Sequence, residues 1–156
     1  MELHSRSGAL HHWRPLAPWI VFSAVLHLAW ETAQLPLYTL WLHPDGAYIV
    51  YAVLHCTAGD VLIATGAYIG AALGTREAAW PLARPWRGIA IAIALTVLYT
   101  AWSEWRNVYD AANWQYRPAM PLVFGIGLSP LLQWVVVPAA TLALLRRRGR
   151  RIRMEP

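Results

Sequence analysis

Four long apolar segments, separated by short polar connections, organise the chain. The segments cover residues 17–41, 47–73, 88–107 and 121–145. Each is close to or above the roughly 20 residues that an α-helix needs to cross the hydrocarbon layer of a membrane. The connections leave no room for a soluble domain and cover residues 43–46, 74–87 and 108–120. This pattern predicts an all-α fold, an antiparallel four-helix transmembrane bundle that forms a single domain over residues 1–156.

Three prolines fall inside the predicted spans. Pro36 lies late in the first span, and Pro130 and Pro138 lie in the fourth. Transmembrane helices tolerate proline because neighbouring helices and side chains satisfy the carbonyl groups that it frees. We therefore expect a kink at Pro36 and a fourth helix that continues through both of its prolines.

The arginines predict the orientation of the spans. All 13 basic residues are arginines, and six of them lie in the tail at residues 146–153. Arg6 and Arg14 precede the first span and three more lie in the second connection, whereas the opposite side holds only Arg106, at the end of the third span, and Arg117. Basic loops stay in the cytoplasm, so both termini are expected there. The net charge of +5 thus indicates contact with anionic lipid, not nucleic acid.

The composition agrees with a protein of the bacterial inner membrane. Hydrophobic residues make up 58% of the chain and charged residues only 13%, against about 25% in ordinary soluble domains. Ten residues are tryptophan. Tryptophan is enriched where a membrane meets water, so we expect Trp41, Trp80, Trp86 and Trp114 to anchor the spans at the interface. The single cysteine, Cys56, excludes an internal disulfide.

Polar residues interrupt each apolar segment at a similar predicted depth. In the first span, His27, Glu31 and Gln34 follow one helical face. The other spans contribute His55 and Asp60, then Tyr99, Ser103, Glu104 and Asn107, then Gln133. A charged group in the middle of a membrane costs at least about 2.5–3.5 kcal/mol. These side chains are therefore expected to face one another inside the bundle, although Arg106 offers Glu104 an alternative partner in an ion pair.

Such a cluster is suited to acid/base chemistry on a lipophilic molecule. Carboxylic acids in an apolar cavity can donate protons, and histidine or an ionised carboxylate can accept them. The candidate catalytic residues are His27, Glu31, Asp60 and Glu104. Aromatic faces can stabilise a carbocation on an isoprenoid or sterol-like skeleton. The candidate ligand-binding residues are Gln34, Trp30, Tyr99, Ser103, Asn107, Gln133 and Trp134.

The same residues resemble a known family. The segment HLAWE, an acid in the second span, Glu104 after Tyr99 in the third, and Trp134 followed by Pro138 resemble the emopamil-binding, sterol-isomerase type of four-span domain known as EXPERA. The resemblance implies a buried cavity for sterol-like or cationic amphiphilic ligands, without a cofactor. For the enzymatic members it implies an isomerase, with double-bond migration by protonation and deprotonation.

Two alternatives remain open from the sequence. His27 and His55 could ligate a haem iron, or a set of histidines and carboxylates could hold a transition metal. Alternatively, the polar groups could only lock helix packing in a structural or assembly subunit, with a second copy of the chain or another membrane subunit as partner. Bound membrane lipid and a lipophilic small molecule are the partners expected under the first interpretation.

Overall fold

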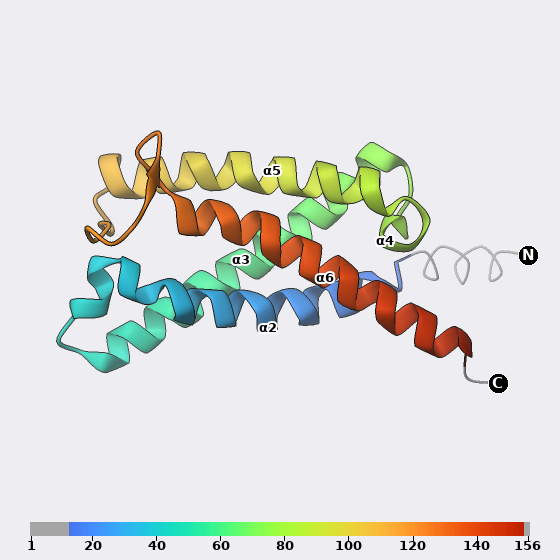
Figure 1. Ribbon diagram of the computed structural model, residues 1–156, viewed down its shortest axis with the longest axis horizontal. Coiled ribbons are helices and arrows are strands. Elements are labelled where there is room, and N and C mark those ends of the chain that lie inside the picture. The colour runs from blue at the N-terminus through green and yellow to red at the C-terminus, as the bar shows by residue number, and fades with distance from the viewer. Residues whose placement is uncertain (1–12, 155–156) are drawn as a thin grey trace, which may run out of the picture.

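The structure is a computed structural model that describes residues 13–154, and its main elements are four long helices. Figure 1 shows these helices side by side, with α2 beginning and α6 ending at the same end of the molecule. Their bounds are α2 Leu16–Gln34, α3 Gly46–Thr75, α5 Pro85–Trp105 and α6 Leu128–Met154. All four are long and apolar enough to cross a membrane, which confirms the prediction of an integral membrane protein.

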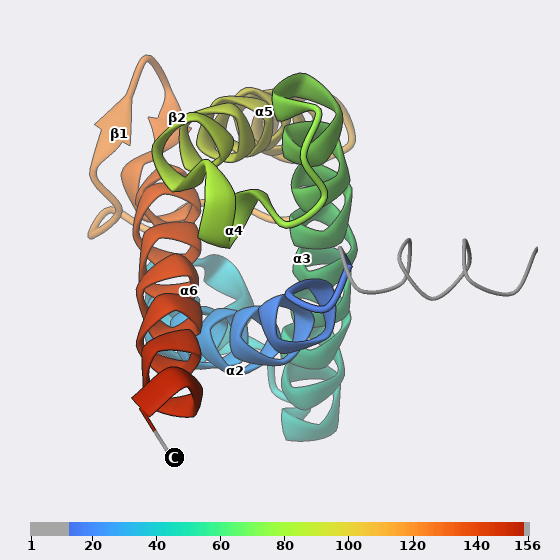
Figure 2. The same ribbon diagram turned by 90° about the vertical axis from the view of Figure 1, so that its right-hand side faces the viewer.

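The four long helices enclose an interior. Helix α3 packs against α2 and α5, and α6 packs against the same two helices from the other side, as Figure 2 shows in a view along the molecule. A short helix, α4 (Trp80–Ala83), connects α3 to α5. Arg6, and the side chains beyond Arg150, lie outside the described part of the chain.

The first predicted span ends earlier than expected. Helix α2 stops at Gln34, and two short 3₁₀ turns follow, η1 at Leu35–Leu37 and η2 at Thr39–Leu42. Pro36 lacks a backbone N–H and restricts the residue before it, so the α-helix ends there and does not continue through a kink. Tyr38, between the two turns, has extended backbone angles.

The fourth predicted span begins later than expected. Residues 121–127 are not helical, because strands β1 (Leu122–Val123) and β2 (Ile126–Gly127) form an antiparallel hairpin. Both central turn residues have positive φ, with Phe124 at 50° and Gly125 at 81°. This backbone matches the twist of a two-residue hairpin. Helix α6 then starts at Leu128, so Pro130 lies in its first turn and only Pro138 lies inside it.

Local signals set the ends of the two middle helices. The Asp45 side chain accepts a hydrogen bond of 2.8 Å from the Ala47 backbone N–H and caps the start of α3. At the other end of α3, Arg76 adopts a left-handed conformation with φ of 55°. Pro85 occupies the first position of α5, where proline is compatible with a helix.

The connection after α5 folds back onto the connection after α2. Helix α5 continues into a π-helical segment, η3 (Arg106–Asp110). Tyr116 then forms a β-bridge with Tyr38, and the Thr39 N–H donates to the Gln115 carbonyl at 2.9 Å. The Arg117 guanidinium donates to the Pro36 carbonyl at 2.9 Å. Two connections that are far apart in the sequence thus hold each other in place.

An aromatic cluster fills the bundle at the end where α2 begins. The rings of Trp19, Tyr68 and Trp80 lie 5.3–5.7 Å apart between centroids and pack against small side chains such as Ala71 and Ala92. The Trp19 indole donates to the Ala64 carbonyl, and the Trp80 indole donates to the Tyr68 carbonyl, both at 3.2 Å. We call this cluster the tryptophan core.

The prediction that Trp80 is an interfacial anchor was therefore wrong, because its side chain is fully buried. Trp41 and Trp86 are exposed, with 49% and 76% of their surface accessible. The predicted anchors thus separate into exposed and buried residues. The difference arises because α4 packs against α3, α5 and α6 and places the Trp80 side chain in the interior of the bundle.

Candidate functional site

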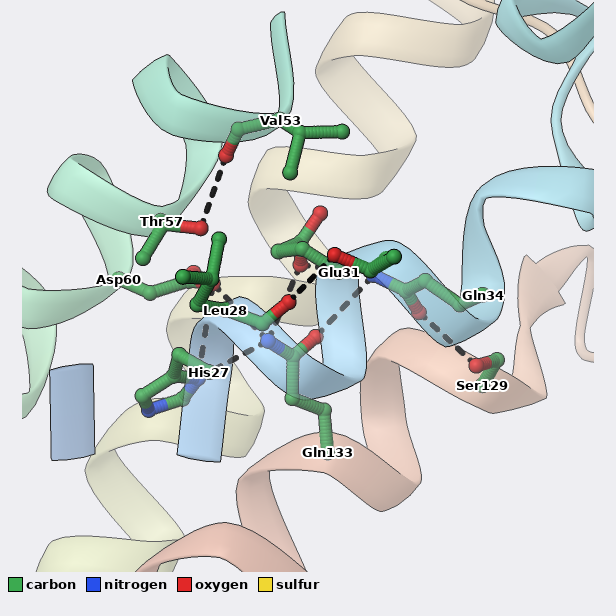
Figure 3. A network of polar contacts seen from close by, with 10 residues as sticks. His27, Leu28, Glu31, Gln34, Val53, Thr57, Asp60, Ser129 and Gln133 are labelled. Atoms are coloured by element: carbon green, nitrogen blue, oxygen red, sulfur yellow. Dashed lines mark hydrogen bonds and ion pairs between the residues drawn. The ribbon is translucent and has the colours of Figure 1, made fainter. Parts of the chain in front are cut away.

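Six polar side chains from α2, α3 and α6 form one hydrogen-bonded network, which we call the polar cluster. Its members are His27, Glu31, Gln34, Asp60, Ser129 and Gln133. Figure 3 shows the Gln133 side chain reaching from α6 toward groups of the other two helices. The Gln133 Nε2 atom lies 2.9 Å from His27 Nδ1, 3.0 Å from Glu31 Oε1 and 2.9 Å from Asp60 Oδ2. Gln133 therefore joins three helices at one point.

A second amide extends the polar cluster along α2. Gln34 Nε2 donates to Glu31 Oε1 at 2.7 Å and to Gln133 Oε1 at 3.3 Å. The Ser129 hydroxyl donates to Gln34 Oε1 at 2.8 Å. Positions 27, 31 and 34 fall on one face of α2, which is why a single helix can supply half of the cluster.

The polar cluster has fewer donor hydrogens than acceptor atoms around Gln133, so it can hold an additional proton. The Gln133 amide nitrogen carries two hydrogens, but three acceptor atoms lie within 3.0 Å of it. Two hydrogens cannot satisfy three acceptors at once. The carboxyl groups of Glu31 and Asp60 also interact directly with each other. At least one further proton can therefore be held among these two carboxyl groups and the His27 ring.

His27 is the imidazole nearest to the two carboxyl groups. Its Nδ1 atom lies 3.5 Å from Asp60 Oδ2. The ring is fully buried and packs against Trp134 with a centroid distance of 4.6 Å. Its Nε2 atom has no hydrogen-bond partner among the described residues. The imidazole is thus oriented by the carboxyl side of the cluster and by an aromatic face.

The third carboxyl group, Glu104 on α5, has a different environment. Its Oε2 atom accepts a hydrogen bond of 2.5 Å from the Tyr116 hydroxyl and a longer one of 3.4 Å from the Tyr38 hydroxyl. Arg106 does not form the expected ion pair with Glu104; its guanidinium lies 5.9 Å from the centroid of the Trp102 ring. The backbone pairing of Tyr38 and Tyr116 explains how both phenols reach one carboxyl group.

Tyr116 remains a hydrogen-bond donor over the whole neutral range. Burial, followed by the hydrogen bond to Glu104, raises the pKa of Tyr116 above its ordinary value of 10.0. A protonated phenol donates to a carboxylate more strongly than to a neutral acid. The Tyr116 hydroxyl can therefore stabilise the Glu104 carboxylate when that group is ionised.

Most of the polar cluster lines the same cavity as Glu104, although His27 and Ser129 are not on its wall. Its volume is about 560 Å³, and Glu31, Gln34, Asp60 and Gln133 lie on its wall together with Glu104. Tyr48 and Tyr51 of α3 and Tyr99 of α5 line the cavity and are also exposed, at 46%, 61% and 44%. The cavity therefore opens at the surface between α3 and α5. In a membrane this surface faces lipid.

Most of the predicted site residues meet at this cavity. Tyr99, Ser103, Asn107 and Trp134 lie on its wall as well. Asn107 also donates to the Ser103 carbonyl at 2.8 Å, which fixes its side chain against its own helix. Trp30 is not on the wall, although the sequence placed it with the ligand-binding residues. Trp30 lies one position before Glu31, and successive side chains of a helix point about 100° apart, so Trp30 is directed away from the Glu31 side chain.

The two histidines proposed as haem ligands have different surroundings. His27 is buried beside Trp134, whereas His55 is exposed and stacks on Tyr51 with a centroid distance of 5.6 Å. Within the described residues, no group of three or more His, Cys, Asp or Glu side chains is arranged to hold a metal ion. The haem and metal interpretations remain predictions from the sequence.

Two site residues were missed in the sequence. Tyr116 and Trp114 lie in the connection after α5, outside any span, and both approach Glu104. Trp114 had been assigned to the membrane interface, but it lines the cavity. These two residues approach Glu104 only because the connection after α5 pairs with the connection after α2. No local sequence pattern predicts that pairing. Tyr38 lies on the polar face of the first span, which was a usable signal.

No family model matches the chain, and no curated protein or solved structure matches it either. The resemblance to the EXPERA domain therefore stays a prediction.

Proposed function

We propose that the chain is a membrane protein whose cavity binds an isoprenoid- or sterol-like molecule and moves a double bond within it by acid/base chemistry. The observation that supports this most is the occurrence of two different carboxyl environments in one cavity. Pairs of titratable groups with distinct surroundings are typical of acid and base roles in catalysis. The EXPERA resemblance of the HLAWE segment supports the same reaction class.

In this proposal the polar cluster supplies the proton. A proton held by Glu31 and Asp60 adds to one carbon of the ligand's double bond, and the neighbouring carbon becomes a carbocation. The pair is left with one more negative charge, which the amide N–H groups of Gln34 and Gln133 stabilise by hydrogen bonds. Gln133 can turn its amide and present either N–H groups or its oxygen to these side chains as their protonation changes.

Glu104 supplies the base in the same proposal. It removes a proton from the carbon on the far side of the carbocation, and the electron pair of that C–H bond forms the new double bond. One proton is added and one is removed, so the isomerisation needs no oxidant or reductant, and transfer of the proton from Glu104 back to the Glu31–Asp60 pair restores both groups for the next turnover. The Tyr116 and Tyr38 hydroxyls keep the Glu104 carboxylate oriented. The aromatic face of Trp134 lies on the cavity wall, where it can stabilise the cation.

We also propose an antiparallel bundle with both termini in the cytoplasm of a bacterium. The uneven distribution of arginines supports this orientation. The cavity then lies in the half of the membrane that is distant from the cytoplasm. The Arg-rich end of α6 would rest on anionic lipid headgroups at the cytoplasmic surface.

The proposal is tested by incubating the purified protein with isoprenoid and sterol alcohols in D₂O. Each turnover would place deuterium from the polar cluster on a carbon of the ligand, which mass spectrometry detects. We expect Asp60→Asn and Glu104→Gln to reduce deuterium uptake by about 100-fold or more, since general acid and base groups each contribute about that much. Asp110→Asn is the matched control, because Asp110 is an exposed acid of the connection.

Three outcomes would contradict the proposal. Absence of deuterium uptake with every ligand would remove the catalytic role. Purification as an obligate complex with another membrane protein, without bound lipid, would favour the structural alternative. A red protein whose Soret band disappears in His27→Ala would instead favour haem.

A further inference from the structure

A second hollow continues from the cavity along the outside of the bundle. It has a volume of about 380 Å³ and is lined by side chains of α3 and α5, among them Leu62, Gly66 and Leu95. Ile63 and Tyr99 line both the cavity and this hollow, which we call the α3–α5 groove. The groove is almost entirely apolar, whereas the cavity holds three carboxyl groups. A polar compartment thus continues into an apolar one.

Two glycines leave both compartments open. A Cβ atom added at Gly59, on the cavity wall, or at Gly66, in the groove, would meet nothing within 4 Å. The groove ends four residues farther along α3, because a Cβ atom at Gly70 would lie 2.6 Å from Leu95 Cδ1. Glycine destabilises a helix by up to about 1 kcal/mol relative to alanine. Gly59 and Gly66 do not allow closer helix packing in return, because the space beside them is empty.

We propose that the cavity and the α3–α5 groove together bind one linear, single-chain isoprenoid lipid. Its functional end lies in the cavity beside the polar cluster, and its chain leaves between the two helices and lies in the groove. This inference rests on the proposed function and adds the shape of the ligand. A flexible linear chain suits this arrangement better than a rigid fused-ring sterol, because the two compartments share only Ile63 and Tyr99 among their lining side chains.

Helix geometry gives the length of the bound chain. Asp60 and Gly66 are six residues apart, which is about 9 Å along α3 at 1.5 Å per residue. Glu104 and Leu95 are nine residues apart, or about 13 Å along α5. The contact between Gly70 and Leu95 closes the far end. The groove therefore admits a chain of limited length, and longer chains must turn out into the lipid.

The test measures binding of geraniol, farnesol, geranylgeraniol and cholesterol to the detergent-solubilised protein by native mass spectrometry. These alcohols have linear chains of 10, 15 and 20 carbons, and cholesterol supplies the fused-ring comparison. Because apolar burial strengthens binding with each added carbon, we expect affinity to rise at least about tenfold from geraniol to geranylgeraniol. Cholesterol should compete poorly with geranylgeraniol.

Two variants separate the compartments. Gly66→Leu fills the groove and should remove the gain from chain length while geraniol still binds with its original affinity. Gly59→Leu fills the cavity and should abolish binding of all three linear alcohols. Gly46→Ala is the matched control, because Gly46 also has open space around it but lines neither compartment. Thermal unfolding of each variant verifies that the bundle remains folded.

The outcomes distinguish the two proposals. If no alcohol binds the wild-type protein, both the lipid cavity and the groove assignment are wrong. If the alcohols bind with equal affinity, if Gly66→Leu leaves the dependence on chain length unchanged, or if cholesterol binds more tightly than geranylgeraniol, only the linear-lipid inference is overturned.

Discussion

The two ends of the bundle use the same four helices but pack them in different ways. At one end, the tryptophan core fills the interior so closely that a Cβ atom at Gly88 would lie 2.0 Å from the Trp80 ring. At the other end, Gly59 faces empty space, and the interior is a cavity with polar walls. Glycine thus permits close contact at one end and leaves room at the other.

This contrast indicates that the two ends have different roles, one in stability and one in holding buried polar groups. Without a hydrophobic effect between helices in lipid, a transmembrane bundle is held together mainly by close packing and interhelical hydrogen bonds. The tryptophan core supplies the close packing. The cavity end depends on hydrogen bonds among polar groups and on the pairing of two connections, so it can hold buried acids. Substitutions at the two ends should therefore differ in kind.

Removing the largest side chain of the core should have the largest effect. Trp80→Ala deletes a fully buried ring and its hydrogen bond to the Tyr68 carbonyl. Such truncations cost about 3–5 kcal/mol, which would lower the unfolding temperature in detergent by at least about 6 °C. Trp86→Ala is the control, because the Trp86 side chain is exposed. Equal losses in both variants would show that the tryptophan core does not hold the bundle together.

Adding a single methyl group should have opposite effects at the two ends. Gly88→Ala drives a Cβ into the Trp80 ring, and overpacking of this kind costs about 1–3 kcal/mol. Gly59→Ala meets no atom and gains up to about 1 kcal/mol of helix propensity. Thermal unfolding of the two variants under identical conditions measures the difference. The contrast is lost if Gly59→Ala destabilises the protein as much as Gly88→Ala does.

Removing the central amide of the polar cluster should cost about 2 kcal/mol. Gln133→Leu takes away the donor that lies within 3.0 Å of three acceptors and leaves buried polar groups unpaired. Thr141→Val is a control in the same helix, because the Thr141 hydroxyl is buried without a hydrogen-bond partner among the described residues. Its removal should be neutral or stabilising. A neutral Gln133→Leu would mean that the network does not stabilise this end.

The smallest effect is expected at the two phenols. Tyr116→Phe removes a hydrogen bond of 2.5 Å to Glu104 and should cost about 1 kcal/mol, and Tyr38→Phe, which removes one of 3.4 Å, should cost less. Because the pKa of Tyr116 is raised in the folded protein, its contribution is fully present below about pH 10 and is lost only at higher pH. Unfolding measured from about pH 6 to pH 9 should therefore show a constant difference between wild type and Tyr116→Phe.

The sequence predicted the helices better than the connections. Helix α3 extends one or two residues beyond each end of its predicted span, since Asp45 and the left-handed Arg76 give local signals. The fourth helix was extended through residues 121–127, which form the hairpin. A hairpin of two-residue strands has too few positions for an alternating pattern to appear. The apolar character of Leu122 and Val123 therefore resembled a span.

The sequence predicted the site residues that follow a helical period and missed those in the connections. His27, Glu31 and Gln34 share a helical face, so their convergence followed from spacing alone. Tyr116 has no periodic relation to Glu104, because a π-helical segment and a loop lie between them. Arg106, two residues away, was the alternative ion-pair partner considered for Glu104, but residues two positions apart in a helix do not face each other.

The sequence by itself determined that this chain forms four apolar helices with acids and histidines at one level, because hydropathy and helical period are local properties. Only the tertiary structure decided which of these groups touch, where the interior is filled and where it is open. Those outcomes depend on contacts between residues up to about a hundred positions apart, such as Gln133 with His27 and Glu31. Contacts at that distance are set by how helices pack, and no local pattern encodes them.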